Sequence, residues 1–158
     1  ANLGDGLFDL PGLRSRAGCW GIGSDSHIGL DPREELRWLE YQARLASGRR
    51  TVLGDANRAD IGANLWGEAV AGGSRAGGAS TGGLRVGADA DWIVLDDADP
   101  AFACAPPEEI MGRWIFGPSR QPPLSVGVAG REVAGSAGHP GRTEFAQSYA
   151  RTLQRLAS

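Results

Sequence analysis

Apolar and polar residues alternate along the chain with two different periods. Apolar residues recur every three or four positions in 32–46, 58–71 and 143–156, which predicts three amphipathic helices. The segment 32–46 carries apolar residues on two faces, so its helix is expected to pack against more than one neighbour. Shorter helices are predicted over 10–16 and 107–114.

Short apolar runs predict the strands. The run 19–23 is typical of a buried parallel strand. From residue 84 onward the period changes, and 84–86 and 92–95 are predicted as strands. The segment 124–135 predicts a hairpin with Gly130 in its turn.

Several residues mark the ends of the helices. Asp31 is expected to be the N-cap of the long helix, with Pro32 at its first position, and Gly48 is expected to end it. Gly72-Gly73 is predicted to close the next helix. Thr143 is expected to cap the last one.

Composition narrows the class of protein. A chain of 158 residues, 41% hydrophobic and 22% charged, can bury a core in one domain or slightly more. The formal net charge of −3 with no basic stripe argues against a nucleic-acid partner. No apolar run approaches the length of a membrane span. Two cysteines are too few for a disulfide framework, so we expect free thiols in a reducing, cytoplasmic compartment.

The sequence Gly-Ser-Asp-Ser-His at 23–27 is the best candidate for chemistry. It follows the predicted strand 19–23, and polar residues at the carboxyl end of a barrel strand face the catalytic mouth. A carboxylate there, such as Asp25, can bind a metal and take a proton from activated water. The residues alone leave a second interpretation open, in which Asp25 is an ordinary turn residue. His27 could contact a substrate, but the residues favour a loop role for it.

Other polar clusters are expected to be structural. Asp89 and Asp91 precede a predicted strand and can accept turn hydrogen bonds, which is a commoner role than metal binding. His139 lies in a Pro/Gly turn and is expected to be exposed and inert. The Gly-rich segment 72–83 lacks the lysine of a phosphate-binding loop.

Four segments carry a resemblance to a known family: "GIGSDSH", "LDPREELRWLEYQARL", "GADADWIVLD" and "VGVAGREVAG". In this order they resemble the C-terminal part of the amidohydrolase superfamily. The combination "ANLGDGLF…GIGSDSH…EELRWLEY" is more specifically similar to the N-formimino-L-glutamate deiminases. The resemblance implies an α/β fold: the C-terminal portion of a (β/α)8 TIM-like barrel, part of a small β-sandwich and a C-terminal helix. The implied domains are 1–80 for the last βα units of the barrel, 81–140 for the sandwich portion and 141–158 for the helix.

The resemblance also implies an activity. Members of this superfamily are metal-dependent hydrolases, and the implied reaction converts N-formimino-L-glutamate to N-formyl-L-glutamate and ammonia in histidine degradation. The implied cofactor is Zn²⁺ or another divalent metal, and the substrate is a small molecule. Asp25 matches the aspartate that ligates the metal and shuttles a proton at the end of the eighth barrel strand.

The remaining metal ligands of the family are mostly histidines, including a His-x-His pair. This chain has two histidines and no such pair. It also begins without a methionine, in a turn-rich segment. We therefore expect a C-terminal fragment lacking most of the active site, whose partner is the remaining N-terminal part of the same enzyme. A homodimer is compatible with this reading, and no membrane partner is expected.

Two alternatives remain open on the sequence. One is another aminohydrolase of the same superfamily, similar to guanine or adenosine deaminases or to chlorohydrolases. The other is a non-catalytic α/β domain in which Asp25 only caps a turn.

Overall fold

The computed structural model describes residues 4–54, 60–78, 82–118 and 121–157. The chain divides into two compact units. Unit 1 comprises Ala1–Ala88 and Asp97–Arg120, and unit 2 comprises Asp89–Asp96 and Gln121–Ser158. Each unit is described by itself below.

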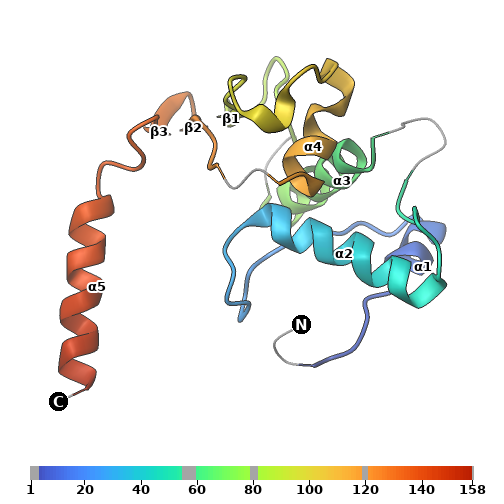
Figure 1. Cartoon of the computed structure of the whole chain (residues 1–158), viewed down its shortest axis with the longest axis horizontal. Helices are drawn as coiled ribbons and strands as arrows, with labels where there is room; N and C mark the ends of the chain where they lie inside the picture. Colours follow the sequence, from blue (N-terminus) through green and yellow to red (C-terminus); the bar gives the residue numbers. More distant parts are fainter. Residues whose placement is uncertain (1–3, 55–59, 79–81, 119–120, 158) are drawn as a thin grey trace. The chain divides into compact units, whose positions relative to one another are not determined.

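Unit 1 is a helical assembly (Figure 1). Helix α2 contacts α1, α3 and α4, and α4 also packs on α3 and on two short 3-10 turns. The elements of unit 1 are α1 (Leu10–Ser15), α2 (Pro32–Ser47), α3 (Ile61–Ala76), η1 (Pro100–Phe102), η2 (Pro107–Glu109) and α4 (Ile110–Phe116).

Capping residues set both ends of helix α2. The Asp31 carboxylate accepts a hydrogen bond from the Arg33 amide at 2.9 Å, and Pro32 occupies the first turn. Gly48 adopts a left-handed conformation with φ 65° and donates its amide to the Arg44 carbonyl at 2.8 Å. These contacts satisfy backbone groups that a helix end leaves without intrahelical partners.

Unit 1 holds the apolar core of the described residues. Leu36 of α2, Leu65 of α3 and Ile115 of α4 are fully buried. Trp66 and Trp114 meet edge to face with ring centroids 5.1 Å apart, and the Arg33 guanidinium lies over the Trp114 ring. The other buried apolar residues are Leu10, Trp20, Ala43, Leu53, Ala69 and Phe102.

Glycines set two close approaches onto α3. A Cβ on Gly72 would collide with the carbonyl oxygen of Trp20, so the segment around Trp20 runs directly against the helix. A Cβ on Gly62 would lie 2.6 Å from the Cα of Gly112, so the backbones of α3 and α4 are in contact at this point. The Asp60 carboxylate caps α3 and also accepts the Gly112 amide at 2.8 Å. Small residues at these positions allow a packing distance that any side chain would prevent.

Two glutamates tie the loops of unit 1 to its helices. The buried Glu40 carboxylate accepts the Leu53 amide at 2.8 Å and the Arg44 Nε at 2.7 Å. The Glu68 carboxylate accepts the Trp20 indole N–H at 2.8 Å and pairs with the Arg14 guanidinium at 2.9 Å. Both carboxylates receive charge-assisted hydrogen bonds, which are stronger than neutral ones.

Unit 2 contains an antiparallel three-stranded sheet in the order β1-β2-β3, followed by α5 (Arg142–Leu156). The strands are β1 (Trp92–Val94), β2 (Ser125–Val128) and β3 (Arg131–Ala134), and Ile93 pairs with Val126 across β1 and β2. Ala129 and Gly130 turn the hairpin with φ 49° and 78°. Asp91 accepts the Ala129 amide at 2.8 Å, as expected for a turn acceptor.

Several predicted elements need correction. The segment 19–23 is not a strand, because its backbone forms no hydrogen-bond ladder with another described segment. The segment 84–86 is not a strand: Leu84 lies in a bend, and the Ala88 amide donates to the Arg85 carbonyl at 3.1 Å to close a turn.

Two predicted helix ends also differ from the structure. Helix α3 continues past Gly72-Gly73 to Ala76. Gly72 lies directly against the Trp20 backbone, so it serves packing rather than termination. Its predicted start at residue 58 lies outside the described residues. Thr143 lies inside α5, whose N-cap is Gly141, and no side chain caps that helix.

The fold class is confirmed in its coarser form, a mixed α/β chain. The barrel portion is not seen, because the described strands form the antiparallel sheet of unit 2 and no parallel pair. The domain boundaries predicted at 80 and 140 stay a prediction. None of the described helices is long and apolar enough to cross a membrane.

Candidate functional site

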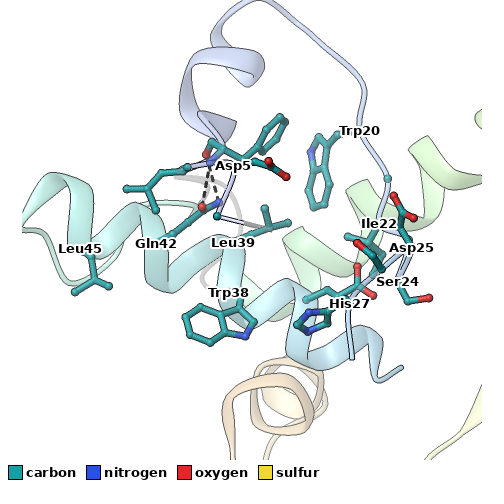
Figure 2. Close-up of a pocket in the computed structure, with 18 residues that line it drawn as sticks. Asp5, Trp20, Ile22, Ser24, Asp25, His27, Trp38, Leu39, Gln42 and Leu45 are labelled. Atoms are coloured by element: carbon teal, nitrogen blue, oxygen red, sulfur yellow. Dashed lines mark hydrogen bonds between the residues drawn. The ribbon is translucent and has the colours of Figure 1, made fainter. Parts of the chain in front are cut away.

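A cavity of about 690 Å³ lies within unit 1. Its walls are the segments 4–8 and 20–27, which lie outside helices and strands, and one face of α2. Figure 2 shows Asp25 and His27 near one end of the cavity and Leu45 at the other. The predicted strand end therefore opens onto a space large enough for a small molecule.

One face of helix α2 lines this cavity. The residues on this face follow one another at helical spacing and are Glu35, Trp38, Leu39, Gln42 and Leu45. The Gln42 side chain accepts the Phe8 amide at 3.0 Å and donates to the Phe8 carbonyl at 3.3 Å (Figure 2). This pair of bonds holds Phe8, at the end of the segment 4–8, against α2.

Asp25 sits at the tip of a tight turn. The His27 amide donates to the Ser24 carbonyl at 2.6 Å, and Asp25 adopts φ 40°. Aspartate tolerates this left-handed region better than most residues, which explains its place in the turn. Its exposed carboxylate makes no hydrogen bond or ion pair with the described residues. No described residue therefore competes with a ligand for the Asp25 carboxylate.

His27 follows on the same turn and also lines the cavity. Its Nε2 is buried and has no hydrogen-bond partner in the described part of the chain. Its Nδ1 has no partner there either, and it remains accessible. A buried polar atom without a partner costs about 1–3 kcal/mol, so this ring does not stabilise the loop through hydrogen bonds.

The residues present do not complete a metal site. No group of three or more His, Cys, Asp or Glu comes together within the described ranges. Asp25 offers one carboxylate, whereas a catalytic zinc site uses about three protein ligands. The chain alone therefore fits a contributor to a metal centre and not the whole centre.

The other polar candidates lie elsewhere. The exposed His139 ring accepts the Gly141 amide through Nδ1 at 3.0 Å and stacks near Phe145 at 5.5 Å. Asp91 serves the hairpin of unit 2, as described above. Neither residue belongs to the cavity.

Asp31 has a perturbed titration. Burial acts to raise its pKa, but hydrogen bonds from the Arg33 side chain and amide and the charges of Arg33 and Arg37 outweigh it. The pKa of Asp31 therefore lies below its ordinary value. This carboxylate is a helix cap with a cationic partner, which is a structural cause of the shift.

Asp25 lines the cavity, and its catalytic and metal-binding role stays a prediction. The apolar residues of α2 were visible as a pattern, yet the pattern did not show that Trp38 and Gln42 would line the same cavity as Asp25. His27 carried no signal beyond its place after Asp25. The segment 4–8 is glycine-rich and ends in Leu7 and Phe8, and nothing in it predicted a cavity wall.

Comparisons with known proteins agree with the resemblance stated above. The chain is 41% identical over 156 residues to the formimidoylglutamate deiminase of Pseudomonas aeruginosa, which covers 99% of this chain and 34% of that protein. It also matches the crystal structure of an amidohydrolase from Brucella melitensis, with TM-score 0.88 and 34% identity, over 99% of this chain and 34% of that one. No protein-family model matches the chain. The chain is thus a partial homologue of formimidoylglutamate deiminase and spans about a third of the length of that relative.

Proposed function

We propose that this chain supplies the C-terminal part of an enzyme that hydrolyses N-formimino-L-glutamate to N-formyl-L-glutamate and ammonia. The observation that carries the proposal is an Asp25 carboxylate that lies at a cavity and has no partner among the described residues, in a chain 41% identical to a formimidoylglutamate deiminase. The chain covers 34% of that relative, so the other residues of the active site would come from outside these 158 residues.

Asp25 is proposed to hold one coordination position of a divalent metal, Zn²⁺ by preference, and to accept a proton from the attacking water. A metal in such a site supplies Lewis-acid activation of water. The turn from Ser24 to His27 holds the carboxylate away from any competing partner in the described chain. The apolar residues of the cavity, Trp38 and Leu39 among them, would limit the access of bulk water.

A chimera tests this proposal. The 156 matching residues of the Pseudomonas aeruginosa deiminase are replaced by this chain, and ammonia release from N-formimino-L-glutamate is measured together with metal content. We expect turnover and about one divalent metal per polypeptide. The same assay with guanine, adenosine and a chlorotriazine separates the proposed substrate from those of related aminohydrolases.

The variant Asp25→Asn then tests the proposed role. We expect kcat to fall about 1,000-fold, because the amide cannot accept the proton and is a poor metal ligand. The matched control is Asp97→Asn, at an exposed residue outside the cavity, which should keep full activity. Unchanged turnover in Asp25→Asn would remove the residue from the mechanism, and a folded but inactive chimera would favour a non-catalytic domain.

A further inference from the structure

The two histidines of the chain differ in how their rings are used. The His139 ring is engaged by the Gly141 amide and by Phe145, so its function is local and structural. The His27 ring has no hydrogen bond to the described residues, with one nitrogen buried and the other accessible. His27 closes the turn through its backbone, because its amide donates a hydrogen bond to the Ser24 carbonyl. The imidazole is therefore not explained by the structure of the loop.

Most of the other nitrogen donors around the cavity are already engaged. The Trp20 indole donates to Glu68, and the Gln42 amide is paired with the Phe8 backbone. No lysine or arginine lines the cavity among the described residues. His27 is thus the nitrogen donor on the turn that also carries Asp25, and its accessible atom is Nδ1.

We propose that His27 is a substrate-binding residue whose Nδ1–H donates a hydrogen bond to a carboxylate oxygen of the substrate. This inference rests on the proposed function, because N-formimino-L-glutamate carries two carboxylates. The bond orients the substrate beside Asp25 and involves no change in covalent structure. A hydrogen bond to a charged acceptor is stronger than a neutral one, which suits a contact that selects an anionic substrate.

The experiment uses the chimeric deiminase with three variants at position 27. We expect His27→Ala to lower kcat/KM about 10- to 100-fold, the loss expected for one hydrogen bond to a charged group. The loss should appear mainly in KM, because the contact is made in both the ground state and the transition state. The variant His27→Asn places an amide N–H near the Nδ1 position and should restore most of kcat/KM, whereas His27→Gln extends toward Nε2 and should not.

Two substrate analogues separate binding from structure. One, 4-formimidoylaminobutanoate, lacks the α-carboxylate, and the other, 2-formimidoylaminobutanoate, lacks the side-chain carboxylate. The effect of His27→Ala should vanish with the analogue that lacks the carboxylate bound by His27, because that substrate cannot accept the hydrogen bond. It should persist with the other analogue. His139→Ala is the matched control and should leave all three substrates unaffected. Metal content should be unchanged in every variant.

The outcomes are distinguishable. An equal loss in His27→Ala with all three substrates, or no loss at all, would overturn the role of His27 while the proposed function stands. Rescue by glutamine instead of asparagine would overturn the assignment to Nδ1. A chimera that is folded but inactive with native His27 would overturn the proposed function, and this inference with it.

Discussion

The helices of unit 1 and the helix of unit 2 differ in whether they bury apolar residues in a core. In unit 1, leucines, tryptophans and an isoleucine from four helices and their loops are buried against one another. In unit 2, the apolar residues of α5 form a stripe that is open to solvent, with Phe145 60%, Tyr149 67% and Leu153 47% exposed. The same helical period thus contributes to a core in unit 1, where α2 still leaves Trp38 48% and Leu45 80% exposed, whereas α5 buries no residue.

The difference lies in the partners and not in the helices themselves. Helix α3 meets α4 and the segment around Trp20 through glycines, so backbone approaches backbone and the flanking side chains interlock. The sheet of unit 2 is held by its hydrogen-bond ladder and by turn contacts such as Asp91 with Ala129. Close packing should therefore dominate the stability of unit 1, and backbone hydrogen bonds that of unit 2.

The largest expected effect comes from adjacent glycines of α3. Gly72→Ala should lower the free energy of unfolding by about 3 kcal/mol, because its methyl group collides with the Trp20 carbonyl and the backbone must move. Gly73→Ala is the matched control, since a Cβ there meets no atom within 4 Å. It should be neutral or gain up to about 1 kcal/mol from helix propensity. Urea unfolding followed by circular dichroism measures both, and equal effects would contradict the packing described for unit 1.

A smaller effect is expected at the cap of α2. Asparagine caps a helix about as well as aspartate, so Asp31→Asn isolates the charge, and the loss at pH 7 should stay below about 1 kcal/mol. Because the pKa of Asp31 is lowered in the folded state, its contribution is present above the unfolded value near 3.9. It is lost as the pH falls through the lower folded pKa. Urea midpoints of both proteins at pH 7, 5 and 3 should converge at the lowest pH, and a constant gap would show that charge is not the cause.

The smallest effect is expected on α5. Leu153→Ser should change the free energy of unfolding of this chain by no more than about 0.5 kcal/mol, because the side chain is 47% exposed and packs on little. The contrast is Leu65→Ser in α3, at a fully buried residue, which should cost several times more. A large loss in Leu153→Ser would mean that the stripe is covered in solution and would end the distinction between the units.

The candidate site was partly predictable. Asp25 stood out because a polar cluster followed an apolar run, and the structure places it at the cavity with a free carboxylate. The walls were not predictable, because Trp38 and Gln42 reach the cavity through the orientation of α2 relative to the segment 4–8. Periodicity gives the faces of a helix but not what each face meets.

The sequence alone determined the helix ends and turns that depend on local chemistry. Asp31 with Pro32 and Gly48 set the ends of α2, and the turn at Gly130 set the hairpin, because caps and turns depend on a few neighbouring residues. Tertiary structure decided the rest. Gly72-Gly73 looks like a helix end but lies within α3, and the packing against Trp20 needs a residue without a side chain at Gly72. The segment 19–23 has the composition of a strand, but a strand also needs a hydrogen-bonded neighbour, and only the surrounding fold can supply one.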